Sequence, residues 1–408
     1  MRIAMLTSWF RYPPSGSGLR FYEIARRLAR RNQVHVYTGI APTSSQSDTS
    51  VDNITVHACG SVRLGHGLER GAMQTNFEVG LRALSSLTRD HLAQRYDLVD
   101  CNITSKMSPF VCFLISRLRR TPIVQTWHEV WHKLIFSKYY AVYGNAALSF
   151  PGFLTEFLMP RVSDHCVAVS RTTKYRLINL LGVRESKITV IPNGVDEALL
   201  RSRPTQKESN TILYVGRLEP HKRVELLISA FKRLRQDMAC KLLIIGDGSQ
   251  YRNLTGLVSR EHLDDVCFLG TLERQRLVHV LQSASVLVLP SLYEGQGIVL
   301  LEAMAAGTPV IAVSSTQSAV REVVIDGFNG LLADPDPTSL RDALFRLLTD
   351  SHLHKRLRAN GLDYSSRYTW DVAASKTEDL YRSLIQGRSS LLDGEISCQT
   401  RPLSAAHA

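Results

Sequence analysis

The stretch from Val286 to Val310 reads VLVLPSLYEGQGIVLLEAMAAGTPV and carries the strongest structural signal in the sequence. An apolar strand runs into a turn with two glycines, and an apolar helical stretch follows. This order predicts a helix whose first backbone N–H groups lie at the carboxyl end of a parallel strand, where phosphate groups bind. Seven residues separate Glu294 from Glu302. Glu302 could accept hydrogen bonds from a ribose, and Glu294 could reach hydroxyls beyond the phosphates. Alternatively, Glu302 only stabilises the positive end of the helix.

A second motif, LYVGRLEPHKRV, begins in the predicted strand at 211–215. Gly216 forms a turn after this strand, and Arg217 and Lys222 follow it. Two fixed cations at the carboxyl end of a strand could neutralise a diphosphate. Isolated basic residues are usually surface charges, so it is their position in the same domain as the Gly297 turn that favours a site.

Strand-like and helical stretches alternate along almost the whole chain, which predicts an α/β fold of parallel sheets covered by helices. The length of 408 residues suggests two domains at about 150 residues each. We expect an N-terminal domain at 1–195, a polar linker at 196–210 and a C-terminal domain at 211–386. The helix at 371–386 is expected to rejoin the N-terminal domain, and residues 387–408 to form a disordered tail.

The net charge of +12 lies entirely in the first half of the chain. Residues 1–195 carry 24 Lys+Arg and 12 Asp+Glu, whereas residues 196–408 carry 25 of each. A basic half suits nucleic acid, an anionic membrane surface or a phosphorylated acceptor, but also an ordinary solvated surface.

The cysteines and apolar runs indicate where the protein resides. The seven cysteines are scattered and include no CxxC pair, which predicts reduced thiols and no zinc site. The first apolar run is too short for a signal peptide, and no run reaches the roughly 20 residues that span a bilayer. We expect a cytoplasmic protein, with peripheral contact at the inner face of the membrane left open.

Together these motifs resemble the family 4 (group 1) glycosyltransferases of the GT-B fold, whose signature is the same glutamate pair. The resemblance covers nearly the whole chain. It implies two Rossmann-like, doubly wound domains facing each other across a cleft, the first binding the acceptor and the second the nucleotide sugar. It includes the further motifs Pro14–Ser–Gly16–Ser–Gly18, Thr126–Trp–His128–Glu129, Ala168–Val–Ser170, Val190–Ile–Pro192–Asn193–Gly194–Val–Asp196 and Gly246–Asp–Gly248.

The resemblance implies roles for residues of the C-terminal domain. Arg217 and Lys222, beside Gly216, would hold the diphosphate, and Glu302 the ribose. Glu294 and the backbone of Gln296–Gly297 would bind the donor sugar. Gln296 stands where many family members have an aromatic residue, which leaves the sugar open.

In the N-terminal domain, Gly16 and Gly18 would let a loop approach the phosphates, because glycine has no side chain to clash. Family members often have paired glycines here, so the loop geometry is open. His128 would lie near the anomeric carbon, although a lone histidine is more often structural.

The implied reaction retains the anomeric configuration by front-face attack, with the leaving phosphate taking the acceptor's proton. Catalysis would rest on His128, Arg217, Lys222 and Glu294, with two cations and a helix dipole offsetting the leaving-group charge. No metal and no cofactor are expected besides the nucleotide-sugar co-substrate, with GDP or UDP as its nucleotide.

The basic half and the aromatic stretch at 127–160 predict a glycan or lipid-linked acceptor in polysaccharide or glycoconjugate biosynthesis. Aromatic residues with interleaved lysines are typical of an anionic membrane interface, although a core helix pair would look the same. A GT-B sugar-nucleotide epimerase is the nearest alternative, but epimerases lack this glutamate pair. A basic membrane-binding or nucleic-acid-binding protein would leave the glutamates unexplained, and no nucleic-acid partner is expected. A dinucleotide-dependent oxidoreductase would need a GxGxxG after the first strand, and a phosphorylase a lysine-bound cofactor.

Overall fold

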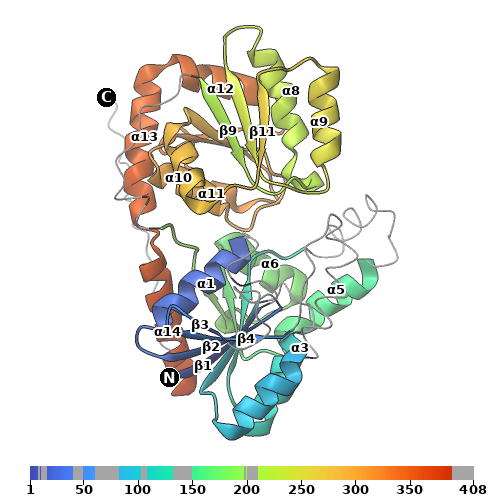
Figure 1. Cartoon of the computed structure of the whole chain (residues 1–408), viewed down its shortest axis with the longest axis vertical. Helices are drawn as coiled ribbons and strands as arrows, with labels where there is room; N and C mark the ends of the chain where they lie inside the picture. Colours follow the sequence, from blue (N-terminus) through green and yellow to red (C-terminus); the bar gives the residue numbers. More distant parts are fainter. Residues whose placement is uncertain are drawn as a thin grey trace.

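The computed structural model describes residues 1–7, 10, 16–39, 49–59, 82–102, 108–131, 149–196, 199 and 210–387. These residues form two α/β domains, each built on one sheet (Figure 1). Most of the predicted linker, and the predicted tail from residue 388 onward, lie outside the described residues.

The N-terminal domain has an eight-stranded sheet with the order β3-β4-β2-β1-β5-β6-β7-β8. Both faces of the sheet are covered, because Ile3 and Met5 of β1 pack in one core cluster and Ala4 and Leu6 in another. The elements are β1 (Arg2–Thr7), α1 (Gly16–Leu28), β2 (Gln33–Thr38), β3 (Thr49–Val51), β4 (Ile54–Ala58), a helix at 82–93, β5 (Leu98–Asn102), α3 (Ser108–Arg119), β6 (Ile123–Trp127), α5 (Ser149–Leu158), η2 (Met159–Arg161), β7 (His165–Ala168), α6 (Arg171–Leu181), η3 (Glu185–Lys187) and β8 (Ile188–Val190).

One edge of this sheet differs from the expected parallel pattern. Strand β3 pairs antiparallel with β4. The two residues between them, Asp52 and Asn53, have positive φ angles of 52° and 65°. Two consecutive left-handed residues make a tight hairpin turn, and Asp and Asn tolerate that conformation better than most residues.

The C-terminal domain has a six-stranded sheet, parallel throughout, with the order β11-β10-β9-β12-β13-β14. Strand β12 is buried on both faces and reads as a continuous apolar run, as expected of a covered parallel sheet. The elements are β9 (Thr211–Val215), η4 (Pro220–Lys222), α8 (Val224–Leu234), β10 (Lys241–Ile245), α9 (Tyr251–Arg260), β11 (Val266–Gly270), α10 (Arg274–Ser283), β12 (Val286–Leu289), α11 (Ile298–Ala305), β13 (Val310–Val313), η5 (Ala319–Glu322), β14 (Leu331–Ala333), α12 (Pro337–Thr349) and α13 (Ser351–Ser366).

The chain crosses between the domains twice, and the two crossings lie side by side. Val195 forms a bridge with Thr369, and its N–H donates to the Tyr368 carbonyl at 2.7 Å. A Cβ on Gly194 would lie 2.3 Å from the Trp370 nitrogen, so only glycine fits there.

Helix α14 (Trp370–Ile385) then packs against α1 of the N-terminal domain (Figure 1). Its Tyr381 hydroxyl donates to Asp100 Oδ2 at 2.5 Å. The last described helix therefore belongs to the core of the first domain. Within the described residues, no helix is long and apolar enough to cross a membrane.

Candidate active site

The turn after β12 brings the start of α11 to the carboxyl end of the C-terminal sheet. Gly297 caps this helix with a φ of 80°, a conformation that favours glycine. A Cβ there would also meet Leu300 and Leu289 side chains at 3.1 and 3.2 Å. The first N–H groups of α11 thus face the end of the sheet, as the sequence predicted for phosphate binding.

Lys222 and Glu294 form an ion pair at this edge. Lys222 Nζ lies 2.7 Å from Glu294 Oε1, and the two side chains are 12% and 10% exposed. Glu294 is fixed from the other side, because its carbonyl accepts the N–H of Ala319 at 2.9 Å and its backbone bridges Ser318. Two of the predicted catalytic residues are therefore brought together by 3₁₀-helix η4 and the β12 turn.

Arg217 stands beside this pair as an exposed cation. Its carbonyl accepts the Tyr214 hydroxyl at 2.8 Å, and its guanidinium forms no ion pair in the described part of the chain. Gly216 precedes it, and a Cβ there would lie 2.9 Å from the Tyr214 hydroxyl. The guanidinium is therefore available to an anion from solvent.

Glu302, one turn into α11, is held by a residue that the sequence interpretation missed. Arg274 at the start of α10 donates from Nη1 to Glu302 Oε1 at 2.6 Å. The Glu302 side chain is 7% exposed. Arg274 carries no motif, so only the folded arrangement of α10 beside α11 reveals the pair.

The N-terminal domain meets this edge through the loop after β6. A Cβ on Gly295 would lie 1.7 Å from the His128 carbonyl oxygen and 3.1 Å from Glu129 Cγ. The two loops therefore touch backbone to backbone across the domain boundary. The carboxyl ends of β6 and β12 face each other at this point.

His128 and Glu129 are both perturbed by this position. Burial, with the charge of Arg20, lowers the pKa of His128 to about 3, and its buried Nε2 has no hydrogen-bond partner. Burial raises the pKa of Glu129, with Lys222 and Arg217 opposing the shift. His128 is therefore a neutral imidazole at physiological pH. Glu129 faces the cations of the C-terminal domain and is a site residue that the family pattern did not assign.

The Gln296 side chain connects the same turn to the first crossing. Its Oε1 accepts the N–H of Asn193 at 2.7 Å. Arg20 of α1, which is 2% exposed, donates to Asn193 Oδ1 at 3.0 Å. The Gln296 amide thus binds the backbone of the first crossing instead of extending freely into the site.

Gly16 and Gly18 lie in the first turn of α1, so the expected glycine loop is helical from Gly16 onward. The helix continues as an amphipathic segment from Leu19, and its first turn includes both glycines, so they lie in a helix start rather than in a loop. A Cβ on Gly16 would come 3.9 Å from Ile298 of α11, so this helix start lies against the C-terminal domain.

A second contact between the domains lies at the start of α6. The Glu322 carboxylate of η5 accepts the N–H groups of Arg171 and Thr172 at 2.7 and 2.6 Å, and the Thr172 hydroxyl at 2.5 Å. A carboxylate at a helix N-terminus is favourable, because the unpaired N–H groups and the helix dipole are positive there. A residue of one domain therefore caps a helix of the other.

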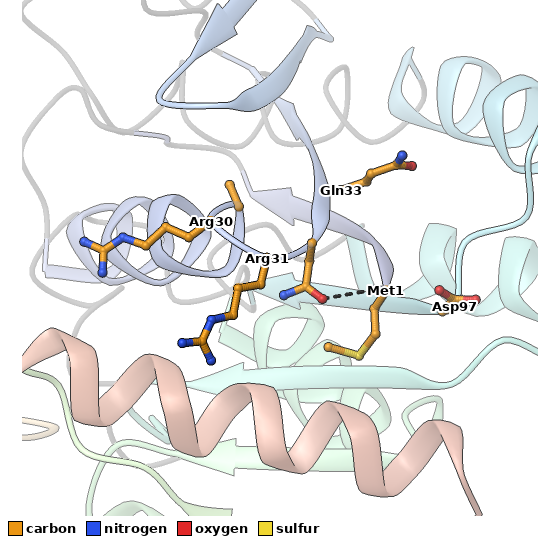
Figure 2. Close-up of a pocket in the computed structure, with 7 residues that line it drawn as sticks. Met1, Arg30, Arg31, Gln33 and Asp97 are labelled. Carbon is orange, nitrogen blue, oxygen red and sulfur yellow. Dashed lines mark hydrogen bonds between the residues drawn. The ribbon is translucent and has the colours of Figure 1, made fainter.

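A cavity of about 520 Å³ lies at the opposite end of the N-terminal sheet, where strands β1, β2 and β5 begin. Figure 2 shows Arg30 and Arg31 pointing away from Asp97, while the Met1 ammonium donates to Asn32 at 3.1 Å. None of the predicted site residues lines this cavity. Its charges do not converge on one point, and it lies at the wrong end of the sheet for a Rossmann-type site.

Two family models match the chain. The model described as Glycosyltransferase Family 4 matches residues 14–199, and the model described as Glycosyl transferases group 1 matches residues 195–363. The two matches meet at the first crossing between the domains.

Curated relatives carry related names. An uncharacterized glycosyltransferase of Methanocaldococcus jannaschii is 32% identical, over 54% of this chain and 60% of that protein. A glycogen synthase of Mycobacterium tuberculosis is 30% identical over 95% of this chain and 96% of that protein. A phosphatidyl-myo-inositol mannosyltransferase of Mycobacterium leprae is 30% identical over 96% of this chain and 99% of that protein.

Solved structures show the same fold. Sucrose-phosphate synthase from Thermosynechococcus elongatus matches with a TM-score of 0.79 at 22% identity, covering 95% of this chain and 100% of that chain. Anabaena HepE in complex with UDP-glucose matches with a TM-score of 0.72 at 20% identity, covering 94% and 100%. These likenesses establish the GT-B arrangement that the sequence predicted.

Proposed function

Because the chain belongs to the family 4 (group 1) glycosyltransferases, we propose that it transfers a hexosyl group from a nucleotide diphosphate sugar, with GDP or UDP as the nucleotide, to a glycan or lipid-linked acceptor. The observation that carries this proposal is the meeting of Lys222, Glu294 and Arg217 at the carboxyl end of the C-terminal sheet. Cations at that edge suit a diphosphate, and a carboxylate beside them suits sugar hydroxyls.

The donor lies with its diphosphate against Arg217, Lys222 and the start of α11. Its ribose meets Glu302, and its sugar lies between Glu294 and His128. A neutral His128 accepts or donates one hydrogen bond without adding charge near the anomeric carbon. A structure of HepE, which shares this fold, holds UDP-glucose, so a donor of this class fits the architecture.

The transfer retains the anomeric configuration and needs no metal. Arg217, Lys222 and the helix dipole offset the charge that develops on the leaving diphosphate. The leaving phosphate takes the proton of the acceptor hydroxyl on the same face of the sugar, so no protein nucleophile takes part.

The acceptor lies on the N-terminal side, where the excess positive charge of the chain resides. Exposed leucines lie on its helices, with Leu154 and Leu158 on α5 and Leu114 on α3, where the exposed Arg117 follows one turn later. Apolar and basic side chains side by side suit the headgroup region of an anionic membrane. The name of the relative from Mycobacterium leprae, phosphatidyl-myo-inositol mannosyltransferase, includes a lipid, which supports a lipid-linked acceptor for this chain. The segment at 132–148, which is half of the predicted aromatic stretch, lies outside the described residues.

The membrane part of the proposal is tested by sedimentation with liposomes. We expect binding to vesicles with anionic lipid that weakens as salt rises. Equal binding to neutral vesicles at high salt, or no binding to either, would remove this part and leave the donor assignment intact.

The transfer itself is tested by proton NMR of the wild-type protein with UDP-, GDP- and ADP-sugars in EDTA. We expect one donor series to release its nucleotide, slowly to water and faster to an added acceptor glycan, with the product keeping the donor's anomeric configuration. An inverted product, or activity only with divalent metal, would contradict the proposed mechanism. Conversion of the donor to an epimer with no transfer would favour the epimerase alternative.

A further inference from the structure

Arg274 and Glu302 form a contact that the proposed donor site does not yet explain. Arg274 Nη1 donates to Glu302 Oε1 at 2.6 Å, and the Arg274 side chain is 37% exposed against 7% for Glu302. The other carboxylate oxygen, Oε2, has no hydrogen bond within the described part of the chain. One oxygen of Glu302 is thus occupied and the other is available.

Arg274 is itself surrounded by acidic groups from three segments. Burial lowers the pKa of Arg274, but the charges of Glu302, Asp196 and Glu23 outweigh that effect and raise it. Asp196 belongs to the first crossing and Glu23 to α1, so the guanidinium lies where the two domains join. Its charge and its position are therefore fixed before any ligand arrives.

We propose that Arg274 is a positioning residue that orients the Glu302 carboxylate toward the ribose of the donor nucleotide. This inference rests on the proposed function. It adds Arg274 to ribose recognition, where Arg274 acts through Glu302 without touching the ribose. A guanidinium donates along fixed directions in its own plane, so its bond to Oε1 restricts the orientations that the carboxylate can adopt. With Oε1 already occupied, Oε2 accepts from a ribose hydroxyl.

The buried position of Glu302 gives Arg274 this influence. A carboxylate that is nearly excluded from water needs a charged partner. Without Arg274, Glu302 would turn toward solvent or bind a different group, and its geometry toward the ribose would be lost.

The test compares ribose recognition in variant proteins by calorimetry. UDP, GDP and ADP and their 2′,3′-dideoxy analogues are titrated into the wild type, Arg274→Ala, Glu302→Ala and the double variant. For the nucleotide that binds best, the wild type should favour the ribonucleotide over its dideoxy analogue by about 10-fold or more. Arg274→Ala should reduce this ratio toward that of Glu302→Ala and leave the affinity for the dideoxy analogue nearly unchanged. The double variant should have the same ratio as Glu302→Ala alone.

Two further variants separate positioning from general damage. Arg276→Ala removes an exposed arginine from the same helix and should leave the ratio unchanged. Arg274→Met keeps the aliphatic stem and supplies the measurement if the alanine variant does not fold.

Two outcomes would overturn the inference alone: an unchanged ratio in Arg274→Ala and Arg274→Met, or an equal loss of affinity for both nucleotide forms. If the wild type binds no nucleotide, or does not distinguish ribose from dideoxyribose, the assignment of Glu302 fails and the inference fails with it. The diphosphate assignment is judged separately, because Arg217→Ala should weaken both nucleotide forms equally.

Discussion

The two halves of the candidate site are organised differently. On the C-terminal side, Arg217 is exposed, whereas the other charged residues form two ion pairs, Lys222 with Glu294 and Arg274 with Glu302, whose carboxylates are nearly buried. On the N-terminal side, His128 and Glu129 reach the site through a loop whose backbone touches Gly295 of the other domain. The two ion pairs of the first half form within one domain, whereas the second half reaches the site only across the domain boundary.

This difference separates binding from turnover. Changes within the C-terminal ion pairs should alter the affinity for the donor and the stabilisation of its leaving group. Changes at the domain boundary should slow transfer while the isolated nucleotide still binds, because the catalytic arrangement forms only on closure.

Lys222→Ala should have the largest effect. It removes a cation from the leaving group and leaves Glu294 buried without its partner, so donor turnover should fall by about 10²–10³-fold. Nucleotide release followed by NMR gives the rate. Lys355→Ala removes an exposed lysine of α13 and serves as the control. A loss below about 3-fold would mean that Lys222 does not touch the leaving group.

Gly295→Ala should slow turnover by about 10²-fold while nucleotide affinity stays within about 2-fold of the wild type. The added Cβ would lie 1.7 Å from the His128 carbonyl oxygen, so the loops must separate. Small-angle scattering should show a larger radius of gyration. Gly256→Ala on α9, where the nearest atom would lie 3.5 Å away at the end of the Arg260 side chain, is the matched control. Normal turnover in Gly295→Ala would show that this contact is not part of the active state.

The stability of the protein should depend on pH through His221. Burial, with the charges of Lys222 and Arg217, lowers the pKa of His221 to about 2 from its ordinary 6.5, so the unfolded chain binds a proton more readily than the folded one. The contribution of His221 is therefore complete above about pH 6.5 and is lost as the pH falls, by about 2 kcal/mol at pH 5.

Urea unfolding of the wild type and His221→Gln between pH 8 and pH 5 measures this contribution to the free energy of unfolding. The variant should lose about 2 kcal/mol less than the wild type on acidification, whereas His279→Gln, at an exposed position of α10, should follow the wild type. If the free energies of unfolding of the wild type and His221→Gln changed equally with pH, His221 would be more hydrated than its burial indicates.

Glu322→Gln should have the smallest effect. The amide keeps one acceptor oxygen but loses the charge that favours the α6 N-terminus, which weakens the contact by about 1 kcal/mol. We expect the KM for the donor sugar to rise about 5-fold with little change in the affinity for the nucleotide alone. If the affinity for the nucleotide alone fell by a larger factor than KM rose, Glu322 would belong to the C-terminal site instead of the domain boundary.

The fold was predictable because its signals are local. Covered parallel strands such as β12 are continuous apolar runs, and the predicted glycine turn does precede α11. The hairpin of β3 and β4 was missed, because its Asp52–Asn53 turn has no glycine to mark it.

The site was predictable only where a motif carried it. Glu294 and Lys222 lie in motifs, and the structure places them 2.7 Å apart. Arg274 and Glu322 make contacts between segments distant in sequence, and nothing in their local sequence distinguishes them from surface charges. Glu129 lies in a quoted motif, but the motif gave it no role. The sequence showed that Gln296 stands where many family members have an aromatic residue. Only the folded chain shows that its side-chain amide accepts the N–H of Asn193.

The proposed donor site depends on the C-terminal turns binding a nucleotide diphosphate. Calorimetric titration of the wild type and Arg217→Ala with UDP, GDP and ADP in EDTA measures this binding. We predict micromolar binding of one nucleotide by the wild type and a loss of about 10-fold or more in the variant, because the guanidinium binds the diphosphate directly in the proposed site. Equal affinities in the two proteins, or no binding by the wild type, would contradict the claim.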